Sequence, residues 1–338
     1  MKVSTEISEG IGDSAAILSI LILNWNGHDD TSRLLKDLSA KISEGRARGV
    51  TVLVLDNGSD TPPPDWWSAL PYVRVEISGE NLGYSGGMSR LCGIAETDYV
   101  WLLNNDVTLA PGALRAALDV IAERPTNVHL PMVLNPDGSV QSRDCFWNPV
   151  LGWRTSSGVP QVDAASYSLF GDIFVAPLFP RALIVDLSLL PAMFHTYGED
   201  IDACYAVAAS GRRVVRAPSI RLEHRKSSSK PKESLTSYQF ECRGIRNIAT
   251  SCILNYEYKS YWAIPLVVAK MMLTEGLWRR RNLLIRCPQA WVSWAKIPPQ
   301  AVLLALRLRR VRAVRKSARR ISDRDIRSLR TEKYDSVG

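Results

Sequence analysis

Four apolar runs in the first part of the chain each lead straight into polar, turn-forming residues, and this pattern restricts the fold more than any other feature. The runs cover residues 16–24, 51–55, 73–77 and 99–103. Continuous apolar runs of this length are typical of parallel strands that are buried on both faces. Stretches of helical length separate them. This short alternation of strands and helices predicts a doubly wound, mostly parallel α/β sheet.

Further helices and a short strand are expected after the fourth run. Pro111 suits the first position of a helix. Gly211 suits the position that follows a helix over 203–210. A short strand is expected at 214–215, ahead of Pro218.

Polar side chains at the ends of the four runs predict a ligand site. They are Asn26, Asp56, Asn81 and Asp106. Each alone is an ordinary turn former. However, the carboxyl ends of parallel strands meet at one edge of an open α/β sheet, which is where ligands bind. Asp106 is a suitable ligand for a hard divalent cation that holds phosphate oxygens.

A second acidic cluster and one histidine complete the candidate chemistry. Glu199, Asp200 and Asp202 stand at a predicted helix start, where acids complement the helix dipole. A two-residue step rotates by about 200°, so Asp200 and Asp202 point to different sides, and one can face a cleft while the other caps. His224 follows the short strand. With Asp106 it could bind Mn²⁺ or Mg²⁺ that also holds phosphate oxygens and water.

Five motifs in the chain resemble, in order and spacing, those of the inverting GT-A-fold glycosyltransferases of family 2, and within them the rhamnosyltransferase-like bacterial members. The resemblance extends over about residues 18–229. It implies a GT-A (nucleotide-diphospho-sugar transferase) domain at 16–230. The motifs occupy 23–27 (LNWNG), 54–60 (VLDNGSD), 81–87 (NLGYSGG), 102–107 (LLNNDV) and 197–202 (YGEDID).

The resemblance implies that the first three motifs bind the donor nucleotide. Asn26 and Asp56 would hold the base, with Asp56 accepting the pyrimidine N3–H. Asn81 and Gly83 would cover the nucleotide. Arg90 stands just beyond this motif, where the family often has another residue type, and is a candidate contact for the diphosphate.

The remaining motifs are implied to carry the metal and the base. Asp106 and His224 would hold Mn²⁺ or Mg²⁺, and Asn104 or Asn105 would lie near ribose or sugar hydroxyls. Asp200 would be the general base, with Glu199 in support. The Asp-x-Asp pattern of the family keeps only its last acid here. We therefore expect tight metal binding only together with the nucleotide sugar.

The reaction implied is a single displacement that inverts the anomeric carbon. The donor that the resemblance favours is dTDP-rhamnose, with UDP- or GDP-sugars as alternatives. The acceptor is a glycan or a polyprenyl-diphosphate-linked glycan in cell-envelope polysaccharide synthesis. A dehydrogenase lacks support, because no GxGxxG motif follows the first run. A non-enzymatic nucleotide- or membrane-binding protein would leave the acidic strand ends unexplained.

The positive charge is concentrated at the C-terminal end. The net charge is +8, yet residues 279–338 hold 17 Lys and Arg against four Asp and Glu. Residues 234–338 are predicted to be helical, with apolar and cationic faces that bind an anionic membrane surface. A basic solvated tail is the alternative. Nucleic acid is not expected as a partner, because no recognition motif accompanies the charge.

Targeting signals and cysteines favour a cytoplasmic protein at the inner face of the cell membrane. Residues 1–15 carry three acids and no basic leader, so no signal peptide is expected. No 18-residue apolar window predicts a spanning helix. The six cysteines form no CxxC pair, which favours free thiols in a reducing compartment. The oligomeric state stays open, a homo-oligomer included.

Overall fold

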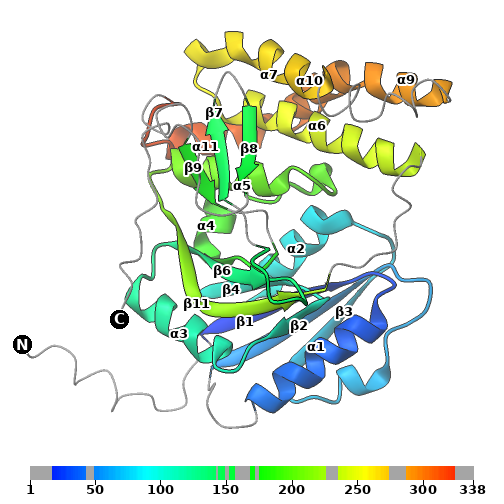
Figure 1. Ribbon diagram of the computed structural model, residues 1–338, viewed down its shortest axis with the longest axis vertical. Helices are drawn as coiled ribbons and strands as arrows, with labels where there is room; N and C mark the ends of the chain where they lie inside the picture. Colours follow the sequence, from blue (N-terminus) through cyan, green and yellow to red (C-terminus); the bar gives the residue numbers. More distant parts are fainter. Residues whose placement is uncertain are drawn as a thin grey trace, which may run out of the picture.

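The computed structural model describes residues 17–42, 49–141, 144–148, 152–156, 168–171, 175–225, 235–273 and 287–323. Its centre is an eight-stranded sheet in the order β3-β2-β1-β4-β10-β6-β11-β5 (Figure 1). In that order the strands are Val73–Ser78, Val50–Asn57, Leu18–Asn24, Tyr99–Asn104, Leu178–Pro180, Val128–Leu134, Val214–His224 and Val107–Leu109.

The first four strands of this order form the predicted parallel half of the sheet. β1 pairs in parallel with β2 and β4, and β2 with β3. The register sets Asn24 beside Asp56 and Leu23 beside Asn104. The strand ends therefore meet at one edge, as the sequence predicts. The doubly wound, mostly parallel α/β architecture is confirmed.

The other half of the sheet departs from the sequence prediction. β10 is antiparallel to both β4 and β6, and β5 is antiparallel to β11. β11 continues far beyond the expected strand at 214–215. A register shift between Ala217 and Arg221 accommodates Pro218, which lacks the N–H that a regular ladder needs. Because β5 follows directly, Asn105 and Asp106 form a turn between two strands.

Helices cover both faces of the sheet (Figure 1). The apolar side chains of α1 and α3 pack in one core cluster, and those of α2, α4 and α5 pack in another. α3 begins at Ala113, with Gly112 at φ 80° before it, so the prediction that Pro111 is its first residue is wrong. These helices are α1 (His28–Lys41), α2 (Gly83–Ile94), α3 (Ala113–Glu123), α4 (Arg181–Asp186) and α5 (Glu199–Ala209).

A three-stranded antiparallel sheet and two single turns complete the first part. The small sheet has the order β8-β7-β9. Its strands are Gly152–Ser156, Asp144–Asn148 and Ser168–Gly171, and the 3₁₀ turns are η2 (Asp65–Trp67) and η3 (Ala192–Phe194).

The C-terminal region is helical and packs against the sheet domain. α6 lies on α5, and α7, α9 and α10 cover α6 (Figure 1). Many of their buried side chains belong to the same core cluster as those of α2 and α5. Leu254 of α6 and Leu304 and Ala305 of α10 pack instead with Phe194 in a smaller cluster. No helix in the described ranges combines the length and the apolar character that crossing a membrane needs. The elements are α6 (Leu235–Asn255), η4 (Tyr258–Ala263), α7 (Ile264–Met271), α9 (Pro288–Ala295), α10 (Ile297–Arg307) and α11 (Arg309–Ala318).

Candidate active site

The carboxylate of Asp56 is buried at the end of β2 and held by neighbouring donors. Asn24 Nδ2 donates to its Oδ1 at 2.7 Å, and Ser59 Oγ donates to the same oxygen at 2.6 Å. Oδ2 accepts a longer bond of 3.3 Å from the Ser59 N–H. His28 Nε2 lies 3.6 Å from Oδ1. A carboxylate accepts about four hydrogen bonds, so this fixed group retains capacity for a further donor such as a pyrimidine N3–H.

Asn26 ties the ends of β1 and β2 together. Its Nδ2 donates to Asp60 Oδ2 at 3.0 Å, and its Oδ1 accepts from the Asp60 N–H at 2.8 Å. Its backbone has φ 53°, a left-handed conformation that asparagine tolerates better than most residues. Trp25 beside it is 54% exposed and so presents an aromatic face at the same edge.

The loop of Asn81 and Gly83 is closed by side chains from two directions. Gly83 N–H donates to Asn81 Oδ1 at 2.8 Å, and Leu82 N–H donates to Asn57 Oδ1 at 3.0 Å. Gly83 has φ 71°, and a Cβ there would lie 2.4 Å from the carbonyl oxygen of His195. Only glycine fits this approach, which brings the start of α2 against the loop before α5.

Asn104 and Asn105 have different surroundings. Asn105 Nδ2 donates to Thr31 Oγ1 at 3.1 Å and to the carbonyl of Gly27 at 3.3 Å. It therefore holds the start of α1. The side chain of Asn104 is half-buried and has no hydrogen-bond partner within the described ranges, which makes it the better candidate for a sugar or ribose hydroxyl.

Asp106 and His224 come together across the antiparallel pair of β5 and β11. His224 Nε2 lies 3.1 Å from Asp106 Oδ1, and both side chains are nearly buried. Gln141 contacts His224 Nδ1 at 2.9 Å and thereby orients the ring. Arg225 N–H donates to the Asp106 carbonyl at 3.1 Å, which fixes the turn. The sequence prediction of this pair did not foresee β5, whose pairing sets Val107 beside His224.

This pair fits a divalent metal with few protein ligands. Two ligands of an octahedral ion at about 2.1 Å lie about 3 Å apart, close to the distance between Asp106 Oδ1 and His224 Nε2. In the described part of the chain no group of three or more His, Cys, Asp or Glu side chains surrounds one point. Donor phosphates would therefore have to supply the remaining ligands.

The acids at the start of α5 have distinct environments. Glu199 is 8% exposed, and its Oε2 has no hydrogen-bond partner among the described residues. Burial, and next the Asp200 carboxylate, raises the pKa of Glu199 to about 8. Asp200 is partly exposed, and its Oδ1 accepts the Ile201 N–H at 2.8 Å. Burial, and next the charge of Glu199, raises the pKa of Tyr84 on α2.

Asp202 neither caps α5 nor faces a cleft. It is fully buried and paired in a bidentate manner with Arg315 of α11, with both N–O distances at 2.7 Å. Asn255 Nδ2 also donates to it at 2.8 Å. The expectation that Asp200 and Asp202 point to different sides holds, but the use of Asp202 is structural.

Arg90 does not join the other donor-binding candidates. Its Nη2 lies 3.4 Å from the carbonyl of Ile77 and 3.8 Å from Glu76, both on β3. Arg90 extends toward the edge strand, and the structure gives it no contact with Asp106 or Asn81. A diphosphate contact by Arg90 would need a different side-chain orientation.

Asn247 of α6 is a residue of the site that the sequence analysis missed. Its Nδ2 donates to the carbonyls of Phe194 at 2.8 Å and Tyr197 at 2.6 Å, and lies 3.3 Å from that of Thr196. Asn247 is fully buried. It thus clamps the loop that directly precedes Glu199. A polar residue inside an apolar helix face was the available signal.

The same loop carries unusual backbone angles. His195 has φ 63° and Tyr197 has φ 71°. Residues other than glycine and asparagine rarely adopt such positive values. Arg243 Nη1 lies 2.9 Å from His195 Nδ1. Burial, and next the charge of Arg243, lowers the pKa of His195, so the ring is neutral and accepts this bond. α6 therefore fixes the loop at two points.

Residues 19–152 match the family model described as Glycosyl transferase family 2. This segment includes Asp56, Asn81 and Asp106 and ends before the α5 acids and His224. None of the curated proteins compared with the chain matches it.

Two solved structures illustrate the likeness in fold. The crystal structure of S. aureus TarS 1–349 in complex with UDP aligns over 89% of this chain and 87% of that chain, with a TM-score of 0.54 and 16% identity. The crystal structure of GalNAc-T7 with UDP, GalNAc and Mn²⁺ aligns over 69% of this chain, with a TM-score of 0.51 and 15% identity. The chain spans half the length of the GalNAc-T7 structure. At these identities the likeness shows the fold alone.

The sheet topology and these neighbours define the class: the chain has the fold of GT-A glycosyltransferases. The similarity of residues 19–152 to glycosyltransferase family 2 agrees with this fold.

Proposed function

We propose that this protein is a glycosyltransferase that transfers rhamnose from dTDP-rhamnose, with inversion, to a hydroxyl of a glycan or polyprenyl-diphosphate-linked acceptor in cell-envelope polysaccharide synthesis. The observation that carries the transfer chemistry is the 3.1 Å approach of His224 Nε2 to Asp106 Oδ1 at the strand-end edge. The five sequence motifs favour the rhamnosyl donor. UDP- or GDP-sugars are the alternative donors, and UDP is the nucleotide in the TarS and GalNAc-T7 crystals.

The nucleotide would bind across the ends of β1 and β2. Asp56 accepts the pyrimidine N3–H, for which its carboxylate is already oriented by Asn24 and Ser59. Asn26 shapes the same edge through Asp60. Asn81 and Gly83 close over the nucleotide from the start of α2. Because these donors and acceptors are already oriented, binding of the nucleotide has a smaller free-energy cost of ordering side chains.

Asp106 and His224 would hold Mn²⁺ or Mg²⁺ together with the donor. When bound, such an ion offsets the charge that develops on the leaving nucleoside diphosphate. Gln141 keeps the imidazole turned so that Nε2 faces Asp106. Asn104 is the candidate for a hydroxyl of the sugar or ribose.

The α5 acids would manage the acceptor proton. Glu199 holds its own proton at pH 7, because its pKa is raised to about 8. Asp200 is the more exposed of the two and is the proposed general base for the acceptor hydroxyl. The hydroxyl oxygen attacks the anomeric carbon from the face opposite the diphosphate, so a single displacement inverts the configuration.

The acceptor is proposed to reside at the inner face of the cell membrane. α7, α9 and α10 pack on α6 with part of their surface and leave large apolar side chains uncovered on the rest. Trp262 of η4 is 64% exposed. Leu306 of α10 is 61% exposed and is followed in the sequence by Arg307, Arg309 and Arg310. Apolar and cationic groups together suit peripheral binding to an anionic bilayer.

A donor-hydrolysis assay on single variants tests the assignment. Asp200→Asn should lower kcat about 10²- to 10⁴-fold, because a general base contributes that much, with donor affinity nearly unchanged. Asp106→Ala should weaken donor binding and its metal dependence together. Arg90→Gln is the control and should change neither by more than about twofold. Full activity of both the Asp106 and Asp200 variants would contradict the proposed mechanism.

A further inference from the structure

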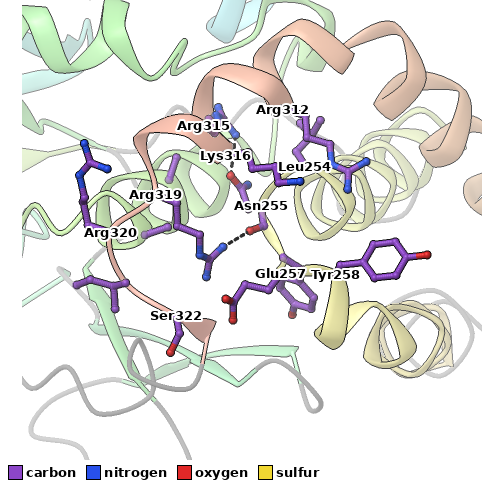
Figure 2. A pocket seen from close by; sticks show the side chains of 14 residues that line it. Leu254, Asn255, Glu257, Tyr258, Arg312, Arg315, Lys316, Arg319, Arg320 and Ser322 are labelled. Atoms are coloured by element: carbon purple, nitrogen blue, oxygen red, sulfur yellow. Dashed lines mark hydrogen bonds between the residues drawn. The ribbon is translucent and has the colours of Figure 1, made fainter.

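A pocket separate from the strand-end site lies at the opposite end of α5 from Glu199 (Figure 2). It has a volume of about 580 Å³, and its walls come from the ends of α5 and α6, the start of η4, and α11 with the residues that follow it. The 11 residues of α5 span about 16 Å. Glu199 and Asp200, at the other end of this helix, do not line the pocket, whereas the buried Asp202 lies behind its floor, bonded to Arg315.

The walls of this pocket carry far more positive than negative charge. One carboxylate, Glu257, lines it, and Lys259 lies 3.3 Å from that carboxylate. The cations that line the pocket are Arg312, Arg315, Lys316, Arg319 and Arg320. Like charges gathered in a concave surface raise the local potential and attract an anion.

Two of the five cations are already neutralised by carboxylates within the protein. Arg315 is paired with the buried Asp202, and Arg319 is paired with Asp323. Arg319 Nη1 also donates to the carbonyl of Asn255 at 2.6 Å. These bonds fix the floor of the pocket and leave little capacity for a ligand.

Arg312, Lys316 and Arg320 have no carboxylate partner among the described residues, and Figure 2 shows Arg320 apart from the other two, beyond Arg319. Arg312 and Lys316 are one helical turn apart on α11, and Figure 2 shows both side chains extending to the same side of that helix. The Arg312 guanidinium lies 5.1 Å from the centre of the Tyr261 ring, which holds it in place. A guanidinium and an ammonium so placed offer a fork and a point charge to a phosphate.

The surroundings indicate where that phosphate comes from. Tyr258 lines the pocket and is 84% exposed. The same short helix, η4, presents Trp262, and α7 continues with Leu266, which are 64% and 50% exposed. Tyrosine and tryptophan beside cations are typical of the level of lipid headgroups.

We propose that this pocket binds the phosphate headgroup of an anionic membrane lipid, with Arg312 and Lys316 as the phosphate ligands. The inference rests on the proposed membrane association for the source of the phosphate, and it does not depend on the donor or on the transfer chemistry. It assigns to α11 the recognition of headgroups and to η4 and α7 the apolar contact.

Vesicle sedimentation with matched charge variants tests the pocket. The vesicles contain phosphatidylcholine and phosphatidylglycerol in a two-to-one ratio, and phosphatidylcholine alone is the blank. Arg312→Gln/Lys316→Gln is compared with Arg309→Gln/Arg310→Gln, which removes two exposed cations of the same helix that do not line the pocket. If the attraction to the vesicles is non-specific, both variants lose the same affinity, because each has lost two positive charges. We expect the pocket variant to lose at least about tenfold more affinity than its control. Equal loss would overturn the pocket.

Two further measurements distinguish a failure of the pocket proposal from a failure of the proposed membrane association. Donor hydrolysis should be unchanged in both variants, which shows that they fold and that the transferase site is untouched. Calorimetric titration with inorganic phosphate distinguishes the sources of the anion. The full chain could bind inorganic phosphate through Arg312 and Lys316 and yet fail to bind the vesicles. That outcome would overturn both the lipid assignment and the membrane association. Vesicle binding that survives in the pocket variant would overturn the pocket alone.

Discussion

At the scale of single residues, Glu199 is a carboxyl group in an environment that differs strongly from water. Its carboxyl is buried, one oxygen lacks a partner among the described residues, and its pKa is about 8. The folded protein therefore binds a proton at Glu199 between about pH 4.5 and pH 8 that the unfolded chain releases. Where the folded state binds more protons than the unfolded state, the free energy of unfolding decreases as the pH rises. The contribution of Glu199 to the free energy of unfolding is therefore fully present below about pH 4.5 and is lost as the pH rises through about 8.

Replacing Glu199 by glutamine should remove this pH dependence. The amide resembles the protonated acid in shape, so Glu199→Gln should match the wild type near pH 5 and exceed it in stability at pH 8. The expected slope of the difference is about 1.4 kcal/mol per pH unit at most. Urea unfolding of both proteins at pH 5, 6.5 and 8 measures it. Asp60→Asn, an exposed site on the other side of the edge, is the control. A constant difference across this range would contradict the assigned protonation.

At the scale of elements, the clamp between α6 and the loop before α5 predicts a positioning effect. Asn247 holds the carbonyls of Phe194 and Tyr197, and Tyr197 has a left-handed backbone. Asn247→Ala should release the loop and displace the α5 acids. We expect kcat to fall at least tenfold while KM for the donor changes by less than about threefold, because displacements of about 1 Å can cost a hundredfold.

The matched variant for this clamp is Asn247→Asp. It keeps the shape but loses the donors, and a carboxylate facing carbonyls is repelled. It should therefore be at least as impaired as Asn247→Ala. Thr250→Ala, one turn along the same helix, leaves the clamp intact and should keep kcat within about twofold. Normal kcat in both Asn247 variants would show that the loop does not depend on this side chain.

A second contact between elements joins α5 to α11. Arg315 and Asp202 are both buried, and their guanidinium and carboxylate form two bonds of 2.7 Å. Arg315→Met leaves an unpaired buried carboxylate, which typically costs about 3–5 kcal/mol. Chemical denaturation should show this loss. Adding Asp202→Leu should recover most of it, because an apolar pair replaces both charges. If the double variant is no more stable than the single one, the two side chains are not coupled.

The contrast between these elements shows what the sequence could and could not predict. Asn26, Asp56 and Asp106 were found because each directly follows an apolar run, so the local pattern locates it. β5 has three residues and β10 has three, and their identity as strands depends on pairing with partners far along the chain. The roles of Asn247 and Arg315 likewise arise from contacts that span more than 45 residues. No local pattern encodes such contacts.

At the scale of the whole molecule, the described helices of the C-terminal region form one core with the sheet domain. Ile245, Ile248, Val267 and Ile297 are each at most 4% exposed and belong to the same apolar cluster as the buried side chains of α2 and α5. The sequence predicted a boundary near residues 230–234 on the basis of charge and polarity. Packing across that boundary is nevertheless continuous.

A chain that ends at residue 232 should therefore fail to fold cooperatively, even though it retains every candidate catalytic residue. Burial of an aliphatic side chain contributes about 1.5–3 kcal/mol, so loss of these four alone removes about 6–12 kcal/mol. That equals the total stability of a typical domain. Deletion of 324–338 is the control and should preserve a sharp thermal transition, because it removes none of the described helices. Near-UV circular dichroism and calorimetry measure both. A cooperative transition in the shorter chain would show that the sheet domain is stable by itself.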